Sequence, residues 1–145
     1  RPFPTTVLSR LAAKPAAVRS LSTMAESTIF DKILAKEIPS TMVYEDDIAY
    51  AFRDIAPVAP THVLVIPKNK DGLSRLSHSE ERHASVLGHL MYVATKVAKS
   101  EGIAETGYRV VVNNGPQGCQ EVEHLHLHVI GGAQLTWPPG PPVSE

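Results

Sequence analysis

The stretch His124-Leu125-His126-Leu127-His128-Val129-Ile130 is the most informative part of this sequence. Its histidines alternate with apolar residues, and Gly131-Gly132 ends the run. Strict alternation predicts a β-strand, because residues i, i+2 and i+4 of a strand point to the same face. We therefore expect one face to carry the three imidazoles and the other to bury Leu125, Leu127 and Val129.

The composition of the whole chain sets the broad class. Its 145 residues suffice for one domain with a core, and 43% hydrophobic and 20% charged residues are typical of a globular protein. The net charge of −1 provides no basic field for nucleic acid. No apolar run approaches the roughly 20 residues that span a bilayer, so we expect neither a nucleic-acid nor a membrane partner. Cys119 is the only cysteine, which excludes an intrachain disulfide and a CxxC-type zinc site.

Residues 1–25 differ from the rest of the chain. They contain no acid, they are rich in Ser, Thr and Ala, and their basic residues are Arg1, Arg10, Lys14 and Arg19. This composition is typical of an organelle transit peptide, and the other interpretation is a disordered basic tail. We expect the mitochondrion, with the plastid as the alternative. Translation from Met24 would leave the protein in the cytoplasm or nucleus. Residues 26–145 are expected to form the domain, ending in a Pro-rich tail.

The periodicities predict an α+β fold. A short helix with Ile29, Phe30, Ile33 and Leu34 on one face is expected after a cap at Ser27 or Thr28. Ile38-Pro39 is expected to end it. A long helix is expected over 77–101, begun by a capping box of Ser77 and Glu80 and stopped by Gly102. Strands are predicted at 42–44, 48–52, 61–66, 108–112 and 124–130. Because there is no βαβ rhythm, the sheet should be antiparallel.

The histidine strand has three interpretations. Zinc needs ligands within about 2.1 Å, whereas alternate residues of a strand are roughly 6.5 Å apart, so three from one flat strand rarely converge. A polar sheet face with chance histidines leaves the regular alternation unexplained. A nucleophilic site is the third, because a neutral imidazole attacks phosphorus without losing a proton from a hydroxyl. The loop 115–120 (GPQGCQ) and Asn113 would then supply donors to the phosphate.

The histidine run matches the motif HφHφHφφ, with φ apolar, and the chain resembles the Hint branch of the histidine-triad (HIT) family. The similarity covers residues 27–140 and is carried by further segments: 29–33 (IFDKI), 36–39 (KEIP), 44–47 (YEDD), 52–55 (FRDI), 59–62 (APTH), 65–68 (VIPK), 88–91 (GHLM), 107–113 (GYRVVVN) and 137–140 (WPPG). The resemblance implies the HIT fold, with a five-stranded antiparallel sheet, one long and one short helix, and a sheet continued across a homodimer. It implies hydrolysis of purine nucleoside phosphoramidates to release AMP, without a cofactor or a catalytic metal.

The resemblance also assigns roles to residues. His126 would be the nucleophile, His128 would contact the phosphate, His124 would orient its neighbour, and His62 would support the site and relay protons. The remaining nucleotide-binding residues fall into three groups. The phosphate would be held by Asn113 and main-chain N–H groups near Gly118 and Cys119, the ribose by Asp54, and the base by Ile29, Phe30, Ile33 and Ile55. From the residues alone, the favoured interpretation of Phe30 and Ile33 is that they belong to the core.

One position departs from the Hint pattern, in which a serine normally precedes Val122. Here Glu121 takes that place, and a carboxylate near a phosphate is repulsive unless it is protonated or turned away. Glu121 would then act as a general acid towards a leaving amine or swing out of a slower site. Three alternatives therefore stay open: a purine-nucleotide-binding module with little turnover, a dinucleoside polyphosphate hydrolase of the Fhit branch, and a zinc protein.

Overall fold

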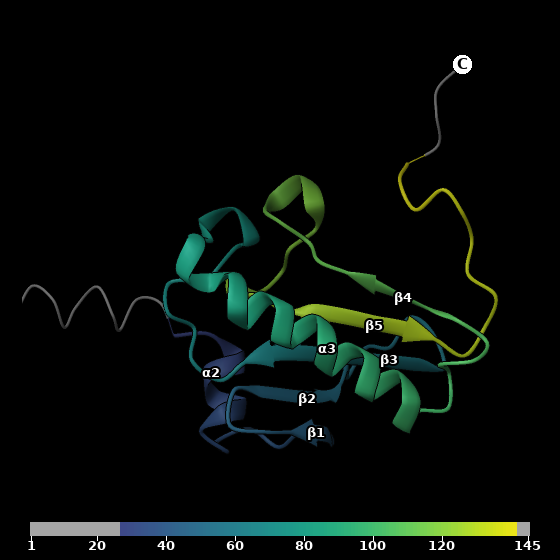
Figure 1. Ribbon diagram of the computed structural model, residues 1–145, viewed down its shortest axis with the longest axis horizontal. Helices are drawn as coiled ribbons and strands as arrows, with labels where there is room; N and C mark the ends of the chain where they lie inside the picture. Colours follow the sequence, from purple (N-terminus) through teal and green to yellow (C-terminus); the bar gives the residue numbers. More distant parts are fainter. Residues whose placement is uncertain (1–26, 142–145) are drawn as a thin grey trace, which may run out of the picture.

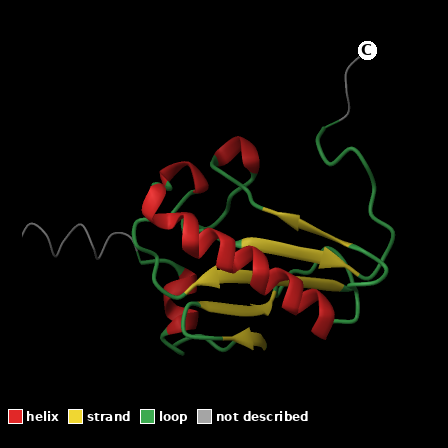
Figure 2. Ribbon diagram, in the orientation of Figure 1, coloured by secondary structure: helices red, strands yellow, loops and turns green. Residues whose placement is uncertain are grey.

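The computed structural model describes residues 27–141. The segment 1–25, expected to direct the chain to an organelle, lies outside the described residues, and its role stays a prediction. The described part is one antiparallel sheet of five strands with a long helix across one face and a short helix against the other (Figures 1 and 2). None of its helices has the length and apolar character needed to cross a membrane.

The strands are ordered β1-β2-β3-β5-β4 across the sheet. They are β1 (Met42–Glu45), β2 (Ala49–Arg53), β3 (Thr61–Pro67), β4 (Tyr108–Val111) and β5 (Leu127–Gly131). All neighbouring pairs are antiparallel, as predicted. β3 is central and buried along its whole length, which explains its run of β-branched and apolar residues.

Alternation along the strands builds two apolar layers. Val63, Val65 and Val129 face the long helix α3 (Ala84–Ser100) and form the larger core with it. Leu64 and Ile66 point to the opposite face and pack with Phe30 and Ile33 of the short helix α2 (Ile29–Leu34). The second layer contains fewer buried residues, and a cavity opens beside it.

The short helix begins as predicted and ends earlier. Thr28 is its N-cap and forms a capping box with Asp31, whose carboxylate accepts from the Thr28 N–H at 2.7 Å. Ala35 already closes the helix, so Ile38-Pro39 lies beyond its end. The core interpretation of Phe30 and Ile33 is confirmed, since they are 5% and 9% exposed.

The predicted start of the long helix at Ser77 is wrong. Leu76–His78 and Glu81–His83 form two 3-10 turns, and α3 begins at Ala84. The expected capping box of Ser77 and Glu80 does not form. The Ser77 N–H donates to the Asn114 side-chain oxygen at 2.8 Å, and the Glu80 backbone is extended. The capping box is formed instead by Glu80 and His83. Gly102, at φ 73°, ends the helix region as expected.

The histidine strand is shorter than predicted. β5 begins at Leu127, so His124 and His126 precede the sheet ladder, whose last pair joins Val65 to Leu127. Pro67 has no N–H to continue the ladder, and the Leu125 N–H donates to the Leu73 carbonyl instead. The alternation is nevertheless kept, because Leu125, Leu127 and Val129 are all buried in the larger core.

Replacing the buried His83 with alanine is expected to lower the free energy of unfolding by about 2–3 kcal/mol. Its side chain is 2% exposed, its Nδ1 accepts from the Glu80 N–H at 2.9 Å, and its Nε2 donates to the Asp71 carbonyl at 3.0 Å. Urea unfolding measures the loss. The matched change at the exposed His78 should cost less than about 0.5 kcal/mol, and equal losses would contradict this role.

Candidate active site

A cavity of about 550 Å³ opens on the α2 side of the sheet. It is called the histidine cavity here, because His62, His126 and His128 lie in its wall. The predicted site residues that line it are Ile29, Phe30, Ile33, Asp54, Ile55, His62, Asn113, Cys119, Glu121, His126 and His128. Two predicted site residues, His124 and Gly118, do not line it.

His126 has a defined protonation pattern. Its Nδ1 lies 2.7 Å from the His124 carbonyl oxygen, which can only accept, so Nδ1 carries the proton. The Nε2 atom therefore has a free lone pair. Burial lowers the pKa of His126, which keeps the ring neutral at neutral pH. The Phe30 ring meets it edge to face, with centroids 5.1 Å apart, and fixes its plane.

A chain of hydrogen bonds fixes the tautomers of His62 and His128. The Val58 N–H donates to His62 Nδ1 at 3.2 Å, so the proton of His62 is on Nε2. That Nε2 donates to His128 Nδ1 at 2.9 Å, which places the proton of His128 on its Nε2. The His128 Nε2–H is buried and has no partner among residues 27–141. An unpaired buried donor in a cavity is suited to an anionic or basic ligand atom.

The environment keeps His128 neutral as well. Burial lowers its pKa to about 4, and the neighbouring rings of His126 and His62 act in the same direction. His128 can therefore donate a hydrogen bond from a neutral ring throughout the physiological pH range. Its role as a ligand contact, predicted from the sequence, fits this geometry.

His124 is held behind the cavity rather than in its wall. The side chain is fully buried, and Nε2 donates to the Pro67 carbonyl at 3.1 Å. Burial lowers its pKa. Its carbonyl oxygen accepts from His126 Nδ1, and its ring packs edge to face against Phe30 with centroids 5.8 Å apart. The prediction that His124 orients its neighbour fits this arrangement, but the orienting atom is in the main chain.

Asp54 lies in the wall of the histidine cavity beside His62. Its Oδ1 accepts from the Ala56 N–H at 2.8 Å, and its Oδ2 lies 3.4 Å from His62 Nε2. The Asp54 N–H donates to the His62 carbonyl at 2.9 Å, so the loop after β2 is tied to the start of β3. The carboxylate is therefore fixed, with 19% of its side chain exposed towards a ligand.

The loop before the histidine run is shaped by its own hydrogen bonds. Asn113 Nδ2 donates to the Cys119 carbonyl at 3.4 Å, and Cys119 has a left-handed backbone at φ 61°. Gln120 uses its amide to hold the loop, accepting from the Gly115 N–H and donating to the carbonyls of Ser74 and Val122. Gly118 lies in the 3-10 turn 116–118 next to the Asn113 backbone. The turn places Cys119, rather than Gly118, at the cavity.

Two predicted residues form the rim. Ile55 is 94% exposed, so it can cover a ligand only from the solvent side. Glu121 is exposed and makes no hydrogen bond or ion pair within the described part of the chain. Sequence reasoning missed Val58, whose N–H sets the tautomer of His62, because a main-chain donor leaves no side-chain pattern.

One group among the described residues brings together atoms that could ligate a metal, namely Asp54, His62 and His128. It includes only one residue of the histidine run. A metal on His62 Nε2 would remove the proton there, while Nδ1 already accepts from Val58. The ring would then have to be an imidazolate, so the hydrogen-bond network as it stands does not fit a metal ion. No chemical step is routed through one.

Comparison with known proteins shows which family the chain is similar to. The HIT domain model matches residues 35–135. The protein named "Adenylylsulfatase HINT1" from Arabidopsis thaliana is 63% identical over 113 residues, which are 78% of this chain and 76% of that protein. The protein named "14 kDa zinc-binding protein" from Zea mays is 61% identical over 127 residues, which are 88% and 97% of the two chains.

Solved structures agree with the sequence relatives. A HIT family hydrolase from Legionella pneumophila Philadelphia 1 has a TM-score of 0.75 and 46% identity, covering 79% of this chain and 100% of its own. A histidine triad protein from Clostridium difficile has a TM-score of 0.70 and 45% identity, covering 74% and 92%. With the family model over residues 35–135 and relatives of this identity along most of their length, the chain belongs to the HIT family.

Proposed function

We propose that this protein hydrolyses purine nucleoside phosphoramidates and releases AMP through a nucleotidyl intermediate on His126. The observation that carries the proposal is the free Nε2 lone pair of His126, held in the histidine cavity by the His124 carbonyl. Membership of the HIT family, which includes a solved hydrolase, supports a nucleotide hydrolase. The amine leaving group and the nucleotidyl intermediate on His126 are the parts that this proposal adds to family membership.

In the first step, His126 Nε2 attacks the phosphorus and the bond from phosphorus to the leaving nitrogen breaks. The leaving nitrogen needs a proton, and a neutral imidazole cannot give one up without a replacement. His128 therefore takes a proton from solvent as the anionic phosphate binds, and its Nε2–H passes a proton to the leaving nitrogen. His128 and His62 are then neutral again and remain joined by their 2.9 Å bond, while the His126 ring gains a positive charge on binding phosphorus.

In the second step, water attacks the same phosphorus and the bond to His126 breaks. The proton lost by water passes to His128 and from there to solvent, so the enzyme recovers its initial state and AMP leaves. Asp54, 3.4 Å from His62 Nε2, stabilises the positive charge that develops during both steps.

The nucleotide can be held by the remaining wall of the histidine cavity. Ile29, Phe30 and Ile33 offer an apolar surface to the base. The fixed carboxylate of Asp54 suits ribose hydroxyls, which are donors. Asn113 and Cys119 also line this wall, and Asn113 Nδ2, which lies 3.4 Å from the Cys119 carbonyl, can donate to the phosphate. The Cys119 and Gln120 N–H groups, expected to help, already donate to the Pro116 and Gly115 carbonyls.

Adenylyl sulfate is a second candidate substrate, because a relative of 63% identity is named an adenylylsulfatase. The same attack by His126 would release sulfate in place of an amine. A direct comparison tests both candidates. We expect purified protein to release AMP from an adenosine phosphoramidate and from adenylyl sulfate, and to turn over a dinucleoside polyphosphate poorly. AMP binding with negligible hydrolysis, rescued by Glu121→Ser, would contradict an enzyme and favour a binding module.

We also propose that the protein is a homodimer. β4 is an edge strand whose residues 108–111 are only partly buried, and its outer N–H and C=O groups face no strand within the described residues. A second copy that adds its own β4 would continue the sheet. Light scattering after gel filtration should therefore give twice the mass of the chain, and the mass of a single chain would contradict this assembly.

Folding stability is expected to fall as the pH is lowered from about 6.5 to about 4. Burial lowers the pKa of His124, His126 and His128 in the folded state, to about 4 for His128. In this pH window the histidines of the unfolded chain, with an ordinary pKa of about 6.5, bind protons that the folded site does not bind, so lowering the pH favours unfolding. The loss should be on the order of 3 kcal/mol, measured by urea unfolding at the two pH values. His128→Asn should flatten the dependence, and the same change at the exposed His78 should not.

A further inference from the structure

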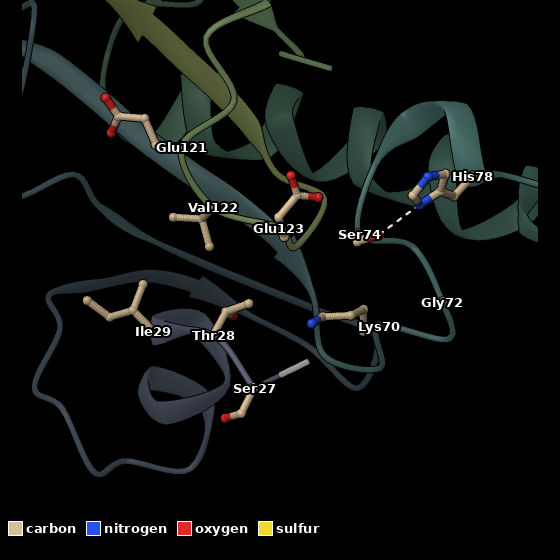
Figure 3. Close-up of a pocket in the computed structure, with 10 residues that line it drawn as sticks. All are labelled: Ser27, Thr28, Ile29, Lys70, Gly72, Ser74, His78, Glu121, Val122 and Glu123. Atoms are coloured by element: carbon tan, nitrogen blue, oxygen red, sulfur yellow. Dashed lines mark hydrogen bonds between the residues drawn. The ribbon is translucent and has the colours of Figure 1, made fainter. Parts of the chain in front are cut away.

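A second cavity of about 620 Å³ adjoins the histidine cavity and is called the side groove here. Figure 3 shows Ser27, Thr28 and Ile29 on one side of it and residues 121–123 on the other, with Ser74 and His78 at the far end. Three residues, Ile29, Glu121 and Val122, belong to the walls of both cavities. The side groove and the histidine cavity therefore adjoin at this shared wall.

The charges of the side groove are neutralised except at that junction. Lys70 Nζ lies 3.6 Å from Asp31 Oδ2, and the Glu123 carboxylate binds the Arg75 guanidinium at 2.8–3.1 Å. The His78 ring shares a 2.8 Å hydrogen bond with Ser74 Oγ. Glu121 makes no such pair with any residue in the range 27–141, so its carboxylate is the uncompensated charge.

The group displaced from phosphorus needs space next to the reacting atoms. A group displaced from phosphorus departs on the side opposite the attacking His126 nitrogen, so a long leaving group needs room beyond the reacting atoms. The side groove is the neighbouring cavity, and Glu121 lies in the wall that the two cavities share.

We propose that the side groove receives the leaving group and that Glu121 makes the site selective for amines that carry a second, positively charged group. This inference rests on the proposed hydrolysis and adds a substrate class to it. A carboxylate at a partly solvated entrance attracts an ammonium group and repels a carboxylate. The electrostatic influence of Glu121 reaches the reacting centre: burial lowers the pKa of His126, while Asp54 and Glu121 act in the opposite direction.

The size of the effect follows from the exposure of Glu121. Single charge pairs near solvent change binding by about two- to fivefold. Changing the leaving group from cationic to anionic reverses the sign, so the full range should be about tenfold. Added salt should reduce the difference, because exposed charges are screened.

The experiment uses three adenosine phosphoramidates whose amines match in length. They are made from 1,4-diaminobutane, butylamine and 4-aminobutyrate, which end in an ammonium, a methyl and a carboxylate group. For the wild-type protein, kcat/KM should decrease in that order. In Glu121→Gln, which keeps the shape and removes the charge, the three values should converge, and in Glu121→Lys the order should reverse.

Glu105→Gln is the matched control, because it removes one negative charge at a site away from both cavities. Glu105 is exposed in the connection between α3 and β4. It should keep the wild-type order. An unchanged order in both Glu121 variants would overturn the assignment of Glu121. The same three compounds bound to a His126→Gly protein, measured by calorimetry, should show the same order of Kd, which tests the side groove without turnover.

The two proposals fail in different ways. If the wild-type protein hydrolyses all three compounds at equal rates and binds them equally, the leaving-group assignment is wrong and the hydrolase proposal stands. If it binds them in the expected order without releasing AMP, the hydrolase proposal is wrong and the charge selectivity of the side groove stands.

Discussion

Replacing His126 with alanine is expected to lower the release of AMP from an adenosine phosphoramidate by at least about a thousandfold. The change removes the only ring in the cavity whose Nε2 has a lone pair directed by the His124 carbonyl. The remaining donors, including the His128 Nε2–H, would still bind the phosphate. The loss should therefore fall on kcat, measured by single-turnover kinetics, with AMP affinity changed only a few-fold.

His89→Ala is the matched control for this loss. His89 lies on α3, on the opposite face of the sheet, where its Nε2 pairs with Asp46 at 2.7 Å. It should keep the wild-type turnover. A His126→Ala protein that also keeps it would show that the nucleophile is another group or water.

Replacing His128 with alanine is expected to lower the hydrolysis of amine substrates by about a hundredfold. The neutral His128 ring offers an unpaired Nε2–H, and its tautomer is fixed through His62 by the Val58 N–H. An amine leaves from phosphorus only after it gains a proton, whereas sulfate leaves as a stable anion. The loss for adenylyl sulfate should therefore be clearly smaller than the loss for a phosphoramidate.

Measuring both substrates with His128→Ala and His62→Ala separates two roles. Proton delivery predicts an amine-selective loss in both variants, smaller in His62→Ala because His128 would keep its N–H. Equal losses for the two substrates would mean that His128 only binds the phosphate. In that case proton delivery by His128 would be wrong.

The sheet and most of the site could be predicted from the sequence because their signals are local. The apolar run at 61–66 predicted a strand, which is the central strand in the structure, and alternation placed Leu125, Leu127 and Val129 in the core. The same alternation placed His126 and His128 on the opposite side, in the histidine cavity. Motif resemblance added Asp54, Asn113 and Cys119, which lie in its wall as expected.

The errors come from contacts between distant segments. The predicted helix start at Ser77 failed because Asn114, far along the chain, takes the Ser77 N–H. The early end of the histidine ladder depends on Pro67 and on the Leu73 carbonyl. The placement of His124 behind the cavity depends on its bond to the Pro67 carbonyl. These contacts join residues that are far apart in the sequence, so residue spacing alone does not predict them.

The measurement that tests the central claim most directly is detection of AMP on His126. Wild-type protein is mixed with an adenosine phosphoramidate, quenched in alkali within one turnover to protect the acid-labile P–N bond, digested, and analysed by mass spectrometry. The account predicts that the peptide with residues 124–128 gains the mass of one adenylyl group, that fragmentation places it on His126, and that His126→Ala lacks it. An adduct on another residue, or full turnover with net inversion at phosphorus and no adduct, would contradict it.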